Sequence, residues 1–488
     1  MKRLEVSGEC RAGFASPFWI AVFVLQAGVF VVATRSVGVA VAMAAAIGVA
    51  ALLVPWIGTP RGTLVFGVVL LVTALVLPGD MALKYRIPVG GGGIFIVDVL
   101  LMLLVLSWSV QLLLTRSIEI VHSPLTVPVI LFLVWVMIAA VIGQLRGNDI
   151  KVILQDARGL AYYVLFLWII TLVRSKDVIK LVLRVLGVCL VTDFVIGALL
   201  ALQGQGERIN FVEEGVSRFP APNEVFVMGT AMLATMVVVW PSGRRRPWYL
   251  WLLLVASLVG VLLALVRGYW IGLGAGMAFL FVITRAGQRV RLVVGGLGLL
   301  LTVVVALAAF SPALFESLVT RALAIGAYAS DTSIQYRLIE NRAVEQQIGR
   351  HPVFGNGLGT GYLFDFSRYG VKPFVKVYIH NNYLWFVQRM GVLGLGLFAW
   401  MMAAFLFSWR DLRPSFTSGD PWLVGLIMGS RVMVVSLLVV SISSPQFNVK
   451  GQVAVTAVIM GLAEVAGVLL REESDGAGVP AGNPGPIV

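Results

Sequence analysis

The amino-acid sequence predicts an all-α polytopic membrane protein with about 12–14 transmembrane helices and one long polar loop that contains an amphipathic helix. Three observations lead to this fold class. The 488 residues are 59% hydrophobic and only 12% charged, and the mean hydropathy is +0.95, values that exclude a soluble globular domain. Apolar runs of about 17–25 residues, long enough to cross a bilayer as helices, recur along the chain. Basic residues gather in alternate connections between these runs.

The sequence contains fourteen such apolar runs. A short polar stretch, residues 1–16, precedes them, eleven of them lie within residues 17–311, and three lie within residues 382–470. The weakest is Gly159–Val173, because it follows the amphipathic stretch NDIKVILQDAR. In order, the runs are Pro17–Thr34, Val37–Ile57, Thr63–Pro78, Ile94–Leu114, Pro124–Ile142, Gly159–Val173, Val178–Leu202, Glu224–Trp240, Trp248–Val266, Gly268–Thr284, Leu292–Ser311, Asn382–Trp409, Trp422–Ile442 and Val453–Leu470.

The basic connections predict the orientation, since loops rich in Lys and Arg stay in the cytoplasm. Both termini are then cytoplasmic, and residues 312–381 form an extracytoplasmic loop. Residues 471–488 are polar and rich in Gly and Pro, and we expect a disordered tail there. The net charge of +13 follows from these loops and from anionic membrane lipids, so no nucleic-acid partner is expected. The basic residues are Lys2, Arg3, Arg11, Arg174, Lys176, Arg244, Arg245, Arg246, Arg285, Arg289, Arg291, Arg410 and Arg413.

Within the long loop, the sequence from Thr332 to Gly349 predicts an amphipathic surface helix. Its apolar positions, close to a 3.6-residue period, are Ile334, Leu338, Ala343, Val344 and Ile348. Arg337 and Arg342 fall on or near the polar side. The helix either caps the bundle or takes part in a site. The following GNGLGTG lacks the Lys-Ser/Thr of a phosphate loop, so its glycines are interpreted as turns.

Two arginines stand at the predicted outer ends of apolar runs, Arg218 in VSRFPAPNEVF and Arg267 in LLALVRGYWIG. A guanidinium presents a rigid set of donors that matches phosphate oxygens. At headgroup depth, the two arginines together could bind the phosphates of a lipid-linked diphosphate. For each arginine alone, the alternative is an interaction with ordinary phospholipid headgroups. Neither a metal nor another cofactor is expected, because three scattered histidines form no ligand cluster.

His380 directly precedes an apolar run on the same predicted outer face. A neutral imidazole can take the proton of a hydroxyl as that oxygen attacks. A histidine at the membrane edge can equally be structural, so its neighbours matter. Asn381, with Arg337 and Arg342, is a further candidate for contacts to an acceptor or to the loop.

RLIENRAVEQQIGRHPVFGNGLGTGY, followed after a spacer by HNNYLWFVQRMGVLGLGLF, resembles the signature of the bacterial O-antigen ligase and O-antigen polymerase family. Upstream, RFPAPNEVFVMGTAML and LALVRGYWIGLGAG resemble two further family segments. The resemblance implies a metal-independent, membrane-embedded glycosyltransferase that takes a glycan from undecaprenyl diphosphate. It also implies that Arg218 and Arg267 bind the diphosphate and that His380 activates the acceptor hydroxyl.

The resemblance places the protein in the bacterial inner membrane, with the site on the periplasmic face. A ligase that transfers O-antigen to a lipid A core is favoured, and a polymerase that extends a growing polysaccharide is the alternative within the family. A transporter or flippase is the alternative from another class. Asp98 and Asp193, each inside an apolar run, would then carry the coupling charge.

Overall fold

The computed structural model describes residues 59–76, 86–89, 92–115, 121–204, 207–208, 217–220, 223–323, 332–367, 371–412, 416 and 419–477. The first two predicted spans, Pro17–Thr34 and Val37–Ile57, lie outside these residues. The chain divides into two compact units, residues 1–117 and residues 118–488.

In the first unit, two apolar helices flank a short hairpin. Helix α4 (Pro60–Val76) packs on helix α6 (Ile96–Thr115), and strands β1 (Arg86–Val89) and β2 (Gly92–Phe95) pair antiparallel. Asp98 lies in the first turn of α6, where its carboxylate accepts a hydrogen bond from the Phe95 backbone N at 2.9 Å.

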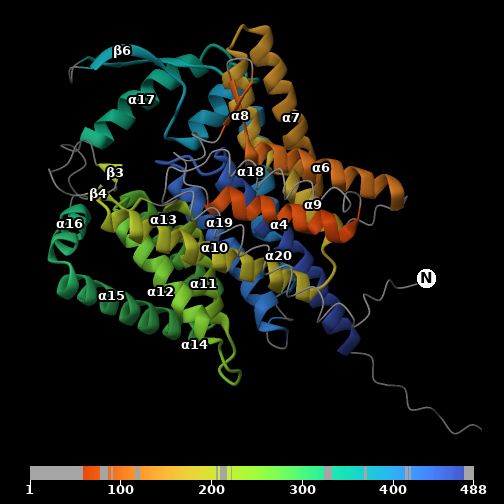
Figure 1. Cartoon of the computed structure of the whole chain (residues 1–488), viewed down its shortest axis with the longest axis vertical. Coiled ribbons are helices and arrows are strands. Elements are labelled where there is room, and N and C mark those ends of the chain that lie inside the picture. The colour runs from red at the N-terminus through yellow and green to blue at the C-terminus, as the bar shows by residue number, and fades with distance from the viewer. Residues whose placement is uncertain are drawn as a thin grey trace, which may run out of the picture. The chain divides into compact units, whose positions relative to one another are not determined.

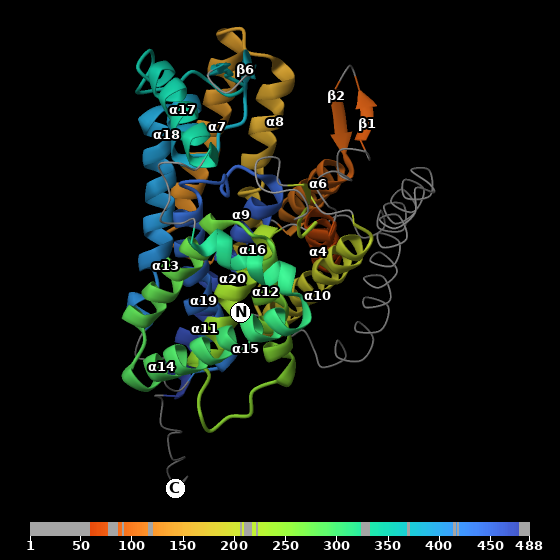
Figure 2. The ribbon, with the colours of Figure 1, turned by 90° about the vertical axis from the view of Figure 1, so that its left-hand side faces the viewer.

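The second unit is a helical bundle, shown from two sides in Figures 1 and 2. Helix α19 is almost entirely buried in it and packs against α11, α13 and α20. Its helices are α7 (Thr126–Leu145), α8 (Ile150–Ala161), α9 (Val164–Leu172), α10 (Lys176–Leu202), α11 (Asn223–Val239), α12 (Trp248–Leu263), α13 (Arg267–Ile283), α14 (Ala286–Val290), α15 (Gly296–Phe310), α16 (Pro312–Leu323), α17 (Thr332–Ile348), α18 (Asn382–Phe407), α19 (Pro421–Val440) and α20 (Lys450–Ala477), with a π-helical turn at Arg291–Gly295 and a 3-10 turn at Arg410–Leu412.

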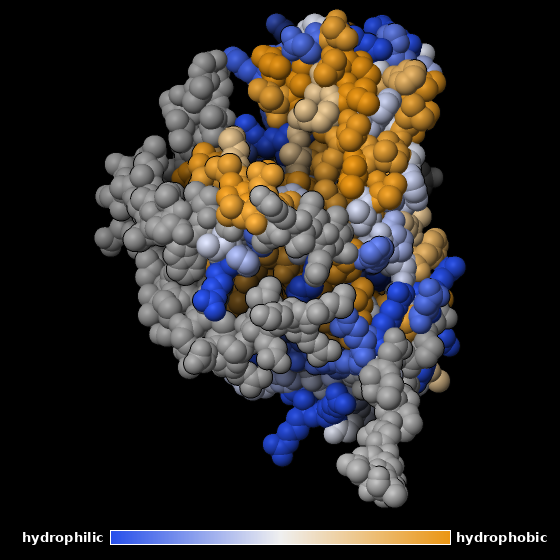
Figure 3. Space-filling view, turned by 90° about the vertical axis from the view of Figure 1, so that its right-hand side faces the viewer, coloured by the Kyte–Doolittle hydropathy of each residue, from blue (hydrophilic) through white to orange (hydrophobic). Residues whose placement is uncertain are grey.

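The described residues contain eight helices that are long and apolar enough to cross a membrane and four shorter apolar helices. Together they match, one to one, the predicted runs from Thr63–Pro78 to Val453–Leu470. The expected all-α polytopic membrane fold is therefore confirmed. Apolar side chains gather over the upper part of the face in Figure 3, where α7 lies. The exposed apolar residues of α7 include Val127, Ile130, Val134, Met137 and Val141, as expected for a lipid-facing surface.

Four features of the fold differ from the sequence prediction: one divided helix, one additional helix, one hairpin and one longer helix. The weak run Gly159–Val173 is two helices, α8 and α9, because the amphipathic stretch before it is itself helical and the chain turns at Tyr162 and Tyr163, both fully buried. The long loop also contains α16 and a hairpin of strands β5 (Tyr362–Phe366) and β6 (Val371–Lys376). At the C-terminal end, α20 continues to Ala477, so residues 471–477 are helical rather than part of a tail, and Glu473 forms an ion pair with Lys176.

Helix α17 has the predicted bounds, but the buried face differs. Val344, assigned to the apolar side, is fully buried as predicted, but Leu338, assigned to the same side, is 44% exposed, and the acidic Glu340 is fully buried. The reason is that Glu340 finds its hydrogen-bond partners inside the protein. In Figure 2, α17 and β6 lie at the top beside α7 and α8, and α14 lies at the bottom.

Helices α13 and α19 approach closely through glycines. A Cβ added to Gly272 would overlap the Val440 side chain and lie 2.7 Å from the Ser436 carbonyl oxygen, and a Cβ on Gly276 would overlap Ser436. Small residues four apart let membrane helices pack backbone to backbone. The packing fixes α13, whose first residue is Arg267.

Candidate functional site

Helix α18 is broken near the site. Gly391 has φ +69° and ψ −176°, so the helix cannot continue through it. The glycine-rich segment enters the break: Asn356 N donates to Gln388 O at 2.7 Å, and Gly357 N donates to Arg389 O at 3.0 Å. Gly355, Gly357 and Gly359 all have positive φ, in agreement with the turns predicted for GNGLGTG. The interruption is thus filled by a loop that satisfies the freed carbonyl groups.

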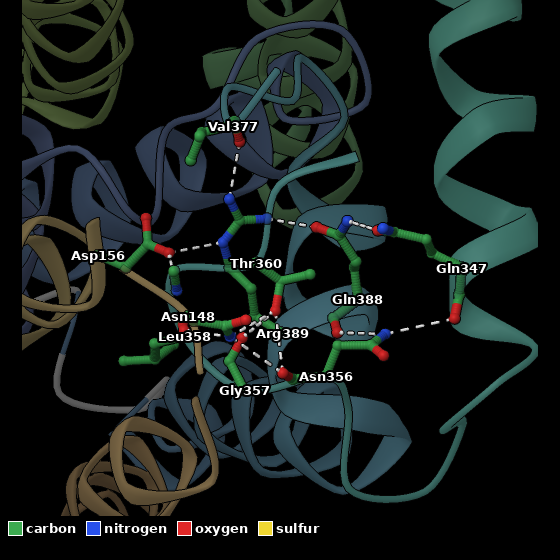
Figure 4. Close-up of polar contacts among 11 residues, drawn as sticks. Asn148, Asp156, Gln347, Asn356, Gly357, Leu358, Thr360, Val377, Gln388 and Arg389 are labelled. Atoms are coloured by element: carbon green, nitrogen blue, oxygen red, sulfur yellow. Dashed lines mark hydrogen bonds and ion pairs between the residues drawn. The ribbon is translucent and has the colours of Figure 1, made fainter. Parts of the chain in front are cut away.

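A buried guanidinium holds this loop in place, as Figure 4 shows. Arg389 is fully buried; its Nε donates to Asp156 Oδ2 at 2.7 Å, and its Nη2 donates to the Val377 carbonyl at 2.7 Å. The same Asp156 oxygen accepts a hydrogen bond from Gly359 N at 2.8 Å. Asn148 Nδ2 donates to the Leu358 carbonyl at 2.9 Å. Helix α8, the loop, the segment after β6 and α18 are thereby joined.

His380 precedes α18, and its ring is held by a carboxylate from α17. The Nδ1 atom lies 2.9 Å from Glu340 Oε2, and the His380 backbone N donates to the same oxygen at 2.8 Å. Glu340 Oε1 accepts hydrogen bonds from the Tyr362 hydroxyl, at 2.8 Å, and from Lys376 Nζ. Glu340 is completely buried, whereas 26% of the His380 side chain is exposed. The histidine therefore has one fixed edge and one accessible edge.

The electrostatics of this cluster favour an ionised Glu340. Burial alone would raise the pKa of the carboxyl, but hydrogen bonds from His380 and Lys376 outweigh it and lower the pKa to about 2. Burial raises the pKa of Tyr362, and the nearby Glu340 charge raises it further. Both tyrosine hydroxyls of the cluster stay protonated, since burial, Glu224 and Glu340 likewise raise the pKa of Tyr378.

Aromatic side chains surround the histidine. The ring of Tyr378 lies edge-on to His380, with centroids 4.9 Å apart, and Tyr336 does the same at 6.0 Å. Lys376 Nζ lies 4.6 Å from the centroid of Tyr336. Half of Tyr378 is exposed. These contacts restrict the rotation of His380 while leaving an aromatic surface beside it.

Arg267 begins α13 after a tight turn in which Leu265 has φ +52°, and it is half-buried. The next residue, Gly268, packs on Ser443, and the Tyr269 hydroxyl donates to Glu224 Oε1, in the first turn of α11, at 2.7 Å. Glu224 also acts electrostatically on Tyr378, two residues before His380. The N-terminal ends of α11 and α13 therefore lie close to the His380 cluster.

The remaining predicted site residues are Arg218, Arg337, Arg342 and Asn381. Arg218 lies in strand β4 (Ser217–Arg218), opposite Glu207 of strand β3 (Glu207–Arg208), and its side chain is outside the described atoms. Arg337 acts electrostatically on Tyr378, whereas Arg342 is exposed on α17. Asn381 caps α18: its Oδ1 accepts hydrogen bonds from the backbone N of Tyr383 at 3.0 Å and of Leu384 at 3.2 Å.

Sequence reasoning did not single out Glu340, Lys376, Asp156 or Arg389. Arg389 stands inside an apolar run, which is a signal, because an ionisable residue at membrane depth is expensive and needs a partner. Glu340 gave no such signal, since it sits among polar residues on a helix that looked solvated. Within the described part of the chain, no group of three or more His, Cys, Asp or Glu side chains could hold a metal ion.

Residues 252–399 match the family model described as O-antigen ligase. No curated protein matches the chain significantly. The matched region runs from α12 into α18 and includes Arg267, Glu340 and His380, whereas Arg218 precedes it. The match includes three of the four segments that carried the resemblance in the sequence, whereas RFPAPNEVFVMGTAML lies before it. The chain is therefore a multi-pass membrane protein that is similar, over residues 252–399, to the O-antigen ligase family.

Proposed function

We propose that the protein transfers a glycan from undecaprenyl diphosphate to an acceptor hydroxyl on the periplasmic face of the inner membrane, as a ligase that uses a lipid A core. The observation that carries this proposal is the partly exposed His380 beside the N-terminal end of α13. Its Nδ1 edge is occupied by Glu340, and the remaining edge is free to meet a substrate hydroxyl.

The reaction needs a base and an anion site. His380 takes the proton as the acceptor oxygen forms a bond to the anomeric carbon, and the bond from that carbon to the diphosphate oxygen breaks. Arg267 and Arg218 stabilise the charge on the leaving diphosphate. The positive end of the helix dipole, at the N-terminal end of α13, favours an anion at the same place. A single displacement of this kind inverts the anomeric centre.

The aromatic surface of Tyr378 suits a sugar ring, because the apolar face of a pyranose packs well against an aromatic ring. Arg337 and Arg342 on α17 contact acidic or phosphorylated parts of the acceptor in this proposal, within a loop that closes over the bound substrates. We expect this surface to lie outside the cytoplasm, because basic connections favour cytoplasmic termini.

The test is a reconstitution of the purified protein with an undecaprenyl-diphosphate oligosaccharide and a lipid A core acceptor, with product mass as the readout. We expect one glycan on each acceptor with wild type, and loss of product with His380→Ala and Arg267→Ala. His351→Ala and Arg244→Ala, at exposed positions, serve as matched controls and should retain activity.

Ladders spaced by one repeat unit, without acceptor, would identify a polymerase instead. Undiminished transfer by His380→Ala would contradict the role of the histidine. Absence of transfer to every acceptor, together with movement of the lipid-linked glycan across vesicles that depends on Asp98 and Asp193, would identify a transporter.

A further inference from the structure

Glu340 lies on α17, forty residues before His380, and is the only fully buried acidic side chain among the described residues of that helix. Its two carboxylate oxygens have different hydrogen-bond partners. Oε2 faces His380 through both the backbone N and Nδ1, and Oε1 faces Lys376 and Tyr362. Every one of these partners comes from the hairpin or from the segment that leads to α18, so the carboxylate cannot turn away without losing several hydrogen bonds.

An ionised carboxylate can only accept hydrogen bonds. With Lys376 paired to Oε1, the negative charge of Glu340 is retained in the buried site. The 2.9 Å contact to His380 therefore requires that Nδ1 carries the proton. A neutral imidazole has one protonated and one unprotonated nitrogen, so Nε2 is left with the lone pair.

We propose that Glu340 is the positioning residue of His380: it fixes the Nδ1–H tautomer and so makes Nε2 the atom that takes the proton from the acceptor hydroxyl. The inference rests on the proposed function. When Nε2 takes that proton, the resulting imidazolium faces Glu340, which stabilises the new charge without becoming protonated itself. The proton then leaves from Nε2 to solvent once the diphosphate has departed.

Orientation follows from the same contacts. The backbone bond from His380 N to Glu340 fixes the main chain, and the edge-on rings of Tyr378 and Tyr336 restrict the imidazole plane. Lys376, over the Tyr336 ring, keeps Glu340 charged without touching the histidine. Helix α17 thus contributes a buried acid to the site, a different role from that of a cap on the bundle.

The first experiment reads the tautomer directly. The chain has three histidines, so a His122→Gln/His351→Gln variant labelled with 15N-histidine gives signals from His380 alone. At alkaline pH we expect a protonated Nδ1 and an unprotonated Nε2, and in Glu340→Gln a change in that distribution. A proton on Nε2 of His380 in the His122→Gln/His351→Gln variant, in which Glu340 is unchanged, would overturn the inference. This result would hold whatever reaction the protein catalyses.

The second experiment measures turnover. Glu340→Gln should lower kcat by roughly 10²- to 10⁴-fold, as the loss of general base catalysis does, with KM for donor and acceptor nearly unchanged. Glu340→Asp should recover part of the loss. Glu345→Gln, an exposed glutamate on the same helix, is the matched control and should behave as wild type.

A double variant separates positioning from folding. Glu340→Gln/His380→Ala should be no slower than His380→Ala alone, because residues that act as a unit are not additive. A further loss in the double variant, or a fall in donor binding equal to the fall in turnover, would show a general structural role and contradict the inference. An inactive wild type would instead refute the proposed function, and the tautomer measurement would still stand.

Discussion

Arg389 and Asp156, separated by 233 residues in the sequence, form a buried ion pair with 2.7 Å between Nε and Oδ2. The pair joins α18 to α8, and the remaining guanidinium donors reach Gln388 and the Val377 carbonyl. Because Val377 lies three residues before His380, the ion pair also supports the segment that carries the histidine. A structural contact far from the chemistry thereby sets the geometry of the site.

Removing one partner of this ion pair should lower the free energy of unfolding. Arg389→Met leaves the Asp156 charge without its guanidinium partner, and we expect the free energy of unfolding to fall by about 3–5 kcal/mol. Thermal unfolding in detergent measures the change. Lys180→Met, which breaks the more exposed pair with Asp420, is the control, and its cost should stay near 0–1 kcal/mol. Equal losses in both variants would show that burial does not matter here.

The break in α18 depends on Gly391. A Cβ there would overlap the Val353 carbonyl oxygen, and its positive φ disfavours any other residue. Gly391→Ala should therefore lower both folded yield and transfer activity. Gly396→Ala, in the same helix with open space around its Cα, should be neutral or stabilising by up to about 1 kcal/mol. Matching behaviour of the two variants in melting and activity assays would refute the interpretation.

Two glycines of α13, one at the contact with α19 and one away from it, allow a second comparison of glycine-to-alanine variants. Gly272→Ala should push the helices apart, because its Cβ meets Val440 and the Ser436 carbonyl, whereas Gly274→Ala meets nothing within 4 Å. We expect a lower melting temperature only for Gly272→Ala. Since α13 begins at Arg267, donor affinity should fall with it. A Gly272→Ala protein with wild-type melting and donor affinity would contradict the prediction.

A second buried pair lies elsewhere in the bundle. Arg431 Nη2 is 2.9 Å from Glu464 Oε1 and 2.7 Å from Ser408 Oγ, beside a pocket of about 450 Å³. Glu464→Leu should cost about 3–5 kcal/mol, because a guanidinium stays buried without its partner. Arg431→Leu/Glu464→Leu should recover most of this loss in the same unfolding assay. A double variant less stable than Glu464→Leu would disprove the coupling.

Low pH should reduce the free energy of unfolding, because Glu340 becomes protonated. Its folded-state pKa of about 2 lies below the ordinary 4.5, so the stabilisation is fully present above pH 4.5 and disappears as pH falls toward 2. The expected contribution is on the order of 3 kcal/mol. Unfolding curves of wild type and Glu340→Gln should converge at low pH, with Glu345→Gln following wild type. A constant difference between wild type and Glu340→Gln across this range would exclude the linkage.

Local sequence signals predicted much of the fold. Apolar length located every membrane helix among the described residues, and capping residues with Gly349 set the ends of α17. The turns of GNGLGTG also followed from composition, since glycine accepts positive φ. These features depend on a residue and its near neighbours, which the sequence displays directly. His380 and Arg267 were proposed as site residues in the same way, as polar residues beside apolar runs.

The partners of those residues were decided by the tertiary structure. Nothing near Glu340 in the sequence indicates that it is buried, and the apolar pattern of α17 does not include it. Its burial is possible only because Lys376, Tyr362 and His380 arrive from later segments and supply donors. The same holds for Arg389 with Asp156. The sequence by itself determined a membrane helix bundle with a histidine at one edge, because hydrophobic length and backbone propensity are local. The tertiary structure decided which charges are neutralised, because pairing energy depends on distances between segments far apart in the chain.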